Sequence, residues 1–113
     1  MTAKNTLLSA PPYAVEQTLK RLGANLRTAR LRRNLTIKDV AEKIGTGPRP
    51  ISDAEKGKPG VSSAVYIALL WVYDLLEQMD DVASPERDEH GLSLSMSRER
   101  LRAREKKELD KEF

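Results

Sequence analysis

The sequence predicts an all-α fold, and three observations support this prediction. Apolar residues at positions 13–33 recur every three or four residues, which is the period of an amphipathic helix. Two short segments, 37–44 and 48–56, are separated by glycine and flanked by residues that begin or end helices. Segment 63–73 is apolar on nearly all sides. At 113 residues the chain can form one compact core but not two, so we expect a single domain with tails.

The first expected helix covers residues 13–33. Its apolar stripe consists of Val15, Leu19, Leu22, Leu26 and Ala29. Asn34 can adopt the left-handed conformation that ends a helix. The preceding residues 1–12 end in Ala-Pro-Pro, which predicts a flexible or extended N-terminal arm.

The next two helices are predicted from their end signals. Thr36 and Asp39 have the spacing of a shortened capping box. Gly45 can supply a turn with positive φ, and Pro48 is favoured as the first residue of the following helix, which stops at Gly57. Two short helices joined in this way are typical of a helix-turn-helix, whose second helix enters the major groove of DNA.

A fourth helix is expected from Ser62 or Ser63 to Tyr73. It has more apolar surface than one small core can cover, so we expect the remainder to be buried in a homodimer. The predicted dimer interface comprises Tyr66, Leu70, Trp71, Tyr73, Leu75, Leu76 and Met79. Its aromatic residues could instead stack on bases, but an apolar helix favours core or interface.

The chain is therefore divided into an arm (1–12), a DNA-binding and dimerisation domain (13–80) and a charged tail (81–113). Residues 80–97 are acidic and expected to be mainly loop, although the alternation in 91–96 would also permit a short strand. A charged helix is expected beyond Arg98. The tail has too few apolar residues to fold alone and suits ordering on a partner.

Charge is strongly segregated along the chain. Residues 20–58 contain eleven Lys or Arg against four Asp or Glu, whereas residues 74–90 contain seven acids and one Arg. The positive charge thus coincides with the predicted helix-turn-helix, which favours a nucleic-acid surface. Lys20, Lys43 and the cluster at 98–107 are interpreted as ordinary surface residues.

Several classes of function lack the residues they need. Cysteine is absent, and the single histidine, His90, has no second ligand at metal spacing, so neither a metal nor a cofactor is expected. No Ser-His-Asp set or phosphate-cradling loop indicates an enzyme. Without a long apolar run or a secretion signal, a soluble cytoplasmic protein associated with the nucleoid is expected.

Between Leu22 and Leu75 the chain resembles the Xre, or phage-repressor-like, helix-turn-helix family, whose domains have five helices. The resemblance begins with Leu22, Gly23, Leu26, Arg27 and Arg30. It continues through Leu35-Thr36, Val40-Ala41, Gly45, Ile51-Ser52, Glu55 and Gly57. Many fixed spacings make this pattern far more specific than a short motif.

Within that family, three segments resemble the HipB-type branch: Gly60-Val61-Ser62, Ala-Ser-Pro-Glu at 83–86, and the basic Leu-Arg-Ala-Arg at 101–104. These proteins are antitoxins that pair with HipA-like serine/threonine kinase toxins and repress their own operon. The resemblance thus implies a HipA-like kinase partner. A palindromic operator is expected for a separate reason, because a small domain with one guanine reader per copy needs two copies to select a site.

The resemblance also implies roles for individual residues. Arg30 and Glu55 would form a structural ion pair between the first and third helices. Base contacts would come from Gly47, Pro48, Arg49, Ser52 and Asp53. Phosphate contacts are expected from Arg33, Lys38, Thr46, Lys56 and Lys58. The family's glutamine after the cap threonine is Ile37 here, and prolines replace polar readers, so Arg49 is the one strong base reader.

The sequence therefore predicts a sequence-specific repressor that binds double-stranded DNA as a dimer. One alternative is a toxin-neutralising or adaptor protein with weak DNA binding, consistent with the proline-rich third helix. Another is a phage-type or restriction-controller regulator. Asp53 could accept from a cytosine amine or pair with Arg49 or Lys56.

Overall fold

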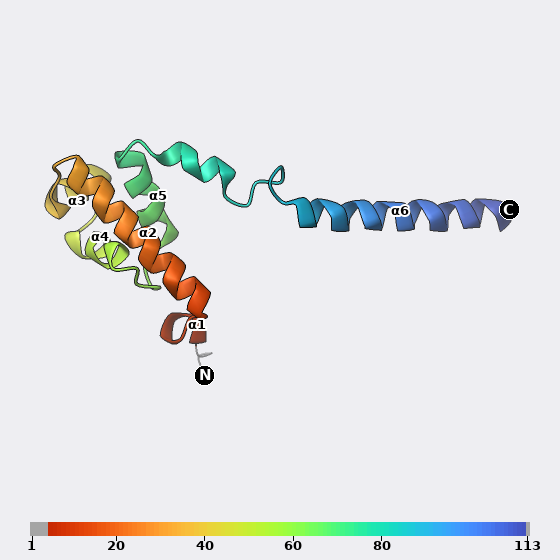
Figure 1. The fold of residues 1–113 in the computed structure, drawn as a ribbon, viewed down its shortest axis with the longest axis horizontal. Helices are drawn as coiled ribbons and strands as arrows, with labels where there is room; N and C mark the ends of the chain where they lie inside the picture. Colours follow the sequence, from red (N-terminus) through yellow and green to blue (C-terminus); the bar gives the residue numbers. More distant parts are fainter. Residues whose placement is uncertain (1–4, 113) are drawn as a thin grey trace. The chain divides into compact units, whose positions relative to one another are not determined.

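A computed structural model describes residues 5–112, and these residues form helices and turns without a strand. The helices are α1 (Thr6–Ser9), α2 (Tyr13–Arg32), α3 (Ile37–Ile44), α4 (Pro48–Glu55), α5 (Ser63–Val72), the 3₁₀ helix η1 (Leu76–Asp81) and α6 (Glu89–Glu112) (Figure 1). The predicted all-α class is confirmed. The expected count of five helices is wrong, because seven form in the described residues.

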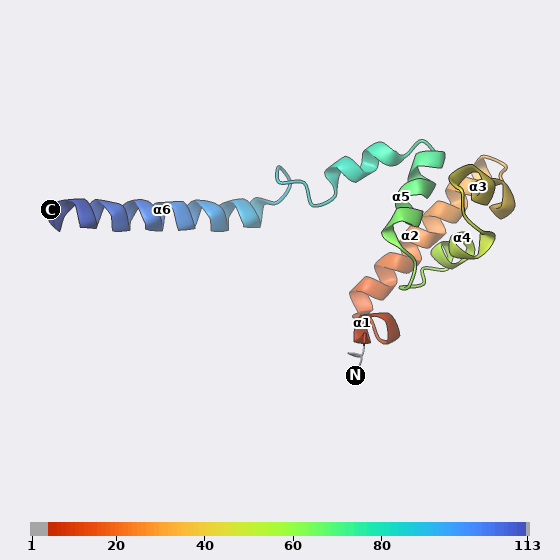
Figure 2. The same cartoon turned by 180° about the vertical axis from the view of Figure 1, so that it is seen from behind.

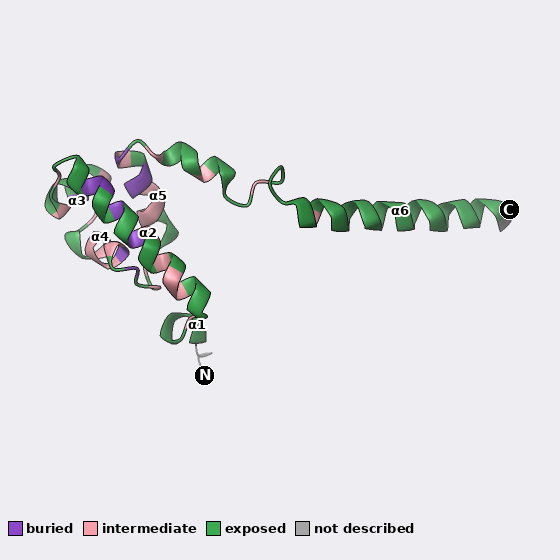
Figure 3. Cartoon of the chain, in the orientation of Figure 1, coloured by how far each residue is buried: buried purple, intermediate pink, exposed green. Residues whose placement is uncertain are grey.

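The chain divides into two compact units, Met1–Leu76 and Glu77–Phe113. In the first, α4 packs on both α2 and α3, and α5 contacts α3 and α4 (Figure 2). The buried apolar residues are Leu26, Ala29, Val40, Ala41, Ile51, Ala54, Leu69, Leu70 and Tyr73. Figure 3 shows buried segments in purple on α2 and α5. The core thus holds α3 and α4 in a fixed arrangement.

The ends of α3 follow local signals in the sequence. Thr36 accepts a hydrogen bond from the Asp39 amide at 3.0 Å, and the Asp39 carboxylate accepts one from the Thr36 amide at 2.9 Å. This capping box confirms the prediction. Gly45 ends the helix at a φ of 80°, and Asn34 has a φ of 54° after α2, both as expected.

Two glycines allow α2 and α4 to approach closely. A Cβ on Gly23 would collide with the carbonyl oxygen of Ala54 and lie 2.7 Å from that of Glu55. A Cβ on Gly57 would lie 2.6 Å from the Cα of Lys20, and Gly57 also has a φ of 72°. Only glycine both adopts this positive φ without strain and leaves room for the Lys20 backbone at position 57. The orientation of α4 on α2 therefore depends on these two residues.

Three expectations outside this core need correction. Residues 6–9 are helical rather than extended because Asn5 caps α1 by accepting from the Leu8 amide; the arm's residues 1–4 lie outside the described residues. The strand alternative for 91–96 is wrong, since these residues belong to α6. The predicted loop at 80–97 shrinks to residues 82–88, because helix extends on both sides of that segment. The charged helix expected beyond Arg98 is present as the C-terminal part of α6.

Candidate nucleic-acid interface

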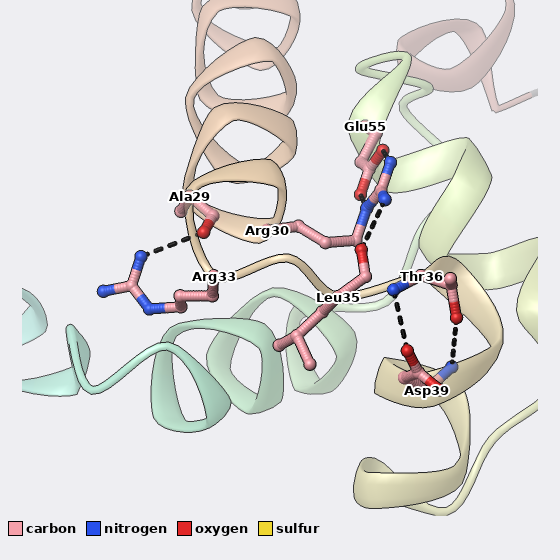
Figure 4. Close-up of polar contacts among 7 residues, drawn as sticks. All are labelled: Ala29, Arg30, Arg33, Leu35, Thr36, Asp39 and Glu55. Atoms are coloured by element: carbon pink, nitrogen blue, oxygen red, sulfur yellow. Dashed lines mark hydrogen bonds and ion pairs between the residues drawn. The ribbon is translucent and has the colours of Figure 1, made fainter.

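A buried ion pair fixes α4 against α2. Arg30 Nε and one terminal nitrogen donate to the two carboxylate oxygens of Glu55 at 2.7 and 3.0 Å, and the other terminal nitrogen donates to the Leu35 carbonyl at 2.9 Å (Figure 4). The hydrogen bonds to Glu55 raise the pKa of Arg30 above its ordinary value. Only 9% and 6% of the two side chains are exposed. A pair this buried and fully bonded serves the scaffold rather than DNA.

Arg33 is occupied in the scaffold as well. Its guanidinium donates to the Ala29 carbonyl at 2.9 Å and to the Tyr73 carbonyl at 2.7 Å, and lies 5.6 Å from the centre of the Tyr73 ring. It therefore satisfies carbonyls at the ends of both α2 and α5. Arg33 is nevertheless exposed, so its predicted contact with DNA phosphates stays a prediction, made by a guanidinium that is already anchored to the protein.

The exposed side of α4 forms a shallow hollow with the start of α3. The hollow is lined by Ile37, Pro48, Arg49, Ser52, Asp53, Lys56 and Lys58. Six of these seven residues are among the base and phosphate contacts predicted from the sequence. The Arg49 side chain is 88% exposed, and Lys56 and Lys58 are also exposed. Three cations thus surround an open surface beside one carboxylate.

Asp53 is paired within the protein. Its Oδ1 lies 3.0 Å from Lys58 Nζ, and its Oδ2 lies 4.0 Å from Arg49 Nε. The interaction with Lys58 is the main reason why the pKa of Asp53 lies below its ordinary value. The carboxylate is therefore ionised at neutral pH. Pairing with Arg49 was one of the predicted alternatives, but the closer partner, Lys58, was not foreseen.

The turn after α4 explains why Lys58 reaches Asp53. The Lys58 amide donates to the Asp53 carbonyl at 3.1 Å, and the Gly57 amide donates to the Ala54 carbonyl at 3.0 Å. This is the Schellman arrangement, and it brings the residue after the glycine back over the last turn of the helix. The glycine at position 57 was the sequence signal that could have identified this pair.

The other predicted contacts lie at the start of α3 and α4. Lys38 is exposed next to Ile37, and Thr46 is half-buried, with its amide donating to the Ala41 carbonyl at 3.0 Å. Gly47 is the N-cap of α4 and provides no side-chain cap. Because prolines at 48 and 50 lack amide hydrogens, the first turn of α4 presents few donors to an anion.

The predicted dimer residues fall into three groups by burial. Tyr73 is completely buried and Leu70 is nearly so, which corrects their assignment to an interface: both fill the core of one copy. Trp71 is 59% exposed and Leu76 is also exposed. Tyr66, Leu75 and Met79 are half-buried. Periodicity could not separate these groups because α5 is apolar on most of its circumference.

A family model described as a helix-turn-helix domain matches residues 21–81, more than half of the chain. The chain belongs to this helix-turn-helix family. No curated protein and no solved structure matches it. In this helix-turn-helix domain α3 and α4 are the two motif helices, and the hollow lies on the exposed side of the second. Domains of this family bind DNA and are typically not enzymes.

Two further findings concern the part of the chain that the structure describes. None of its helices is both long and apolar enough to cross a membrane. Among the same residues, no group of three or more His, Asp or Glu side chains is placed to hold a metal ion.

Proposed function

We propose that this protein is a sequence-specific transcriptional repressor of the Xre type that binds double-stranded DNA. The observation that supports this most is the hollow on α4, where Arg49, Lys56 and Lys58 are exposed on one side of the second motif helix. A helix presented in this way enters the major groove, and its exposed cations meet bases and phosphates. Residues 13–80 form the DNA-binding and dimerisation domain, and residues 81–113 form the tail.

Roles within the site follow from exposure and chemistry. The Arg49 side chain is 88% exposed and can donate two hydrogen bonds to guanine O6 and N7, while Ser52 contacts a neighbouring base. Gly47 and Pro48 let the backbone come close to the DNA. Lys38, Thr46, Lys56 and Lys58 contact phosphates. The main role of Asp53 is to position Lys58, because the Asp53 carboxylate already lies 3.0 Å from the Lys58 ammonium group.

The proposed repressor acts as a homodimer on a palindromic operator in the nucleoid. One guanine reader per copy gives little selectivity, so two α4 helices about 34 Å apart would read two half-sites. Trp71 and Leu76 are the exposed apolar residues nearest in sequence to the C-terminal end of α5 and serve the pairing surface, together with the half-buried Tyr66 and Leu75. Met79, in the second unit, is proposed to contact the partner copy as well.

We further propose a HipB-like role, in which the protein represses its own operon together with a HipA-like kinase. The support is the sequence resemblance at positions 60–62, 83–86 and 101–104. Co-purification with the product of the neighbouring gene tests this part by itself. A neighbouring restriction enzyme or phage gene would instead indicate a controller or a phage-type regulator.

The DNA-binding proposal is tested with Arg49→Ala and Lys56→Ala, using Lys43→Ala as the control on α3 outside the hollow. Affinity is measured for the protein's own upstream DNA and for a scrambled duplex over a range of salt. Arg49→Ala should cost ~1–3 kcal/mol on the upstream DNA alone. Lys56→Ala should weaken both duplexes equally. Unchanged preference in Arg49→Ala would reject the base-reading role, and no duplex binding at low salt would favour the adaptor alternative.

A further inference from the structure

The longest helix of the chain, α6, has a charge pattern that the proposed function does not yet use. It covers Glu89–Glu112, and every residue from 92 to 111 is exposed (Figure 3). Its basic residues are Arg98, Arg100, Arg102, Arg104, Lys106, Lys107 and Lys111. Because residues 92–111 are exposed, their charged and apolar side chains determine which partner α6 can bind.

Four of these cations form a stripe, defined here as Arg100, Arg104, Lys107 and Lys111. Their spacings of four, three and four residues place them within about 60° of one another around the helix and along about 16 Å of its axis. Glu105 and Glu108 lie outside this arc, at least about 40° further round. One side of α6 is therefore continuously positive over three turns.

The stripe has no anionic partner among the described residues. The five ion pairs found there all lie outside α6. Exposed cations without partners keep their whole charge for an external anion, and closely spaced like charges on a helix are destabilising until such an anion binds.

The apolar residues of α6 do not form a comparable face. Leu94 and Leu101 lie close together around the helix, but Leu92 and Met96 lie nearly opposite them, and Leu109 falls between the two pairs. A coiled coil or a helix bound in an apolar groove needs one continuous seam. The arrangement thus favours a polyanion over a helical protein partner.

We propose that the stripe of α6 is a second DNA contact, which binds the phosphate backbone next to the site read by α4. This inference rests on the proposed function. Along the axis of a duplex, each strand carries one phosphate per about 3.4 Å, whereas the four cations of the stripe are spread over about 16 Å of the α6 axis. Each of the four side chains can therefore reach a phosphate. Residues 82–88 link α6 to the helix-turn-helix unit covalently. Once α4 is docked, α6 binds the same duplex at a high effective concentration.

Two variants of equal composition test the proposal on the full-length protein. R100Q/R104Q/K107Q removes two arginines and one lysine from the stripe. R98Q/R102Q/K106Q removes the same residue types from a row on the opposite side of α6, which Glu99 and Glu105 flank within about 20°. Circular dichroism checks that both keep the helix. Dissociation constants are measured for upstream and scrambled duplexes between 50 and 200 mM salt, with R49A in the same series.

The stripe variant should lose at least about tenfold affinity for both duplexes at low salt, and its salt slope should flatten by up to about 2.7, which is 0.9 for each lost phosphate contact. The control should change the slope by less than about 1. Equal effects of the two variants, or no effect of the stripe variant, would overturn the proposal, as would loss of a protein partner with unchanged DNA binding. If the stripe variant fails in one of these ways but R49A still abolishes the preference for upstream DNA, the proposed function survives without the stripe. If the wild type binds neither duplex, the proposed function and the stripe proposal are both rejected.

Discussion

The Nζ atom of Lys58 lies 3.0 Å from the Oδ1 atom of Asp53, across the turn that ends α4. The pair sits at the rim of the hollow proposed to receive DNA. A carboxylate at this place repels phosphates and holds one of the three cations at the same time. We therefore expect Asp53 to limit how strongly the helix-turn-helix domain binds DNA of arbitrary sequence.

Replacing Asp53 by Asn should raise affinity for scrambled duplex DNA. The change removes a negative charge that repels phosphates and competes with them for Lys58, so the salt slope should steepen by up to about 0.9. Affinity for the upstream DNA should rise by the same factor, because a phosphate contact does not depend on the base sequence, so the preference should stay unchanged. Fluorescence anisotropy over a salt series measures both effects. Glu42→Gln removes an exposed carboxylate of α3 outside the hollow and should change neither; an equal response there would mean that net charge alone is responsible.

Neutralising Glu55 should destabilise the fold much more than neutralising Glu16. Glu55→Gln leaves the buried Arg30 charge without its counterion, which costs about 3 kcal/mol of unfolding free energy. Glu16 pairs with Lys20 at 2.9 Å, but the Lys20 and Glu16 side chains are 55% and 42% exposed. Its change should cost less than about 0.5 kcal/mol. Urea unfolding compares the two, and similar losses would contradict the structural role of the Arg30 pair.

Replacing Gly23 by Ala should lower stability although it improves helix propensity. The added methyl would collide with the Ala54 carbonyl and press on that of Glu55 at 2.7 Å. Overpacking of this kind costs ~1–3 kcal/mol, against a gain of about 1 kcal/mol from propensity. Gly60→Ala is the control, since nothing lies within 4 Å of its added Cβ. A stabilised Gly23 variant in thermal unfolding would show that α2 and α4 do not pack this closely.

Tyr73→Phe should be neutral or stabilising at neutral pH, by up to about 1 kcal/mol. The Tyr73 hydroxyl is buried and has no hydrogen-bond partner among the described residues, so its removal leaves no group unsatisfied. The ring remains below Arg33. A loss of more than about 1 kcal/mol in urea unfolding would mean that the hydroxyl makes a stabilising bond.

The same residue should make stability depend on alkaline pH. Burial raises the pKa of Tyr73 from 10.0 to about 12. The unfolded chain therefore ionises first, and wild-type stability should fall as the pH rises from 10 toward 12. Tyr73→Phe lacks this component, so its advantage should grow over that range. Parallel denaturation curves for the two proteins at pH 8, 10 and 11 make the comparison, and a constant difference would contradict the raised pKa.

The sequence by itself determined α2, α3, α4 and α5, because the ends of these helices depend on interactions within one turn. The Thr36 and Asp39 capping box, the positive φ of Gly45 and the proline at the start of α4 all act locally. The hollow on α4 was anticipated for the same reason, since it consists mostly of neighbours along one helix. Where local signals conflicted, as in the alternating residues 91–96, helix prevailed.

Only the tertiary structure decided which of the candidate residues remain available. Arg33 binds the carbonyl of Tyr73, forty residues away, and Tyr73 itself fills the core instead of an interface. Such assignments depend on how helices distant in sequence pack, and a periodic pattern on one helix does not contain that information. The pattern tells which residues can face a partner, whereas packing determines which of them the core has already used.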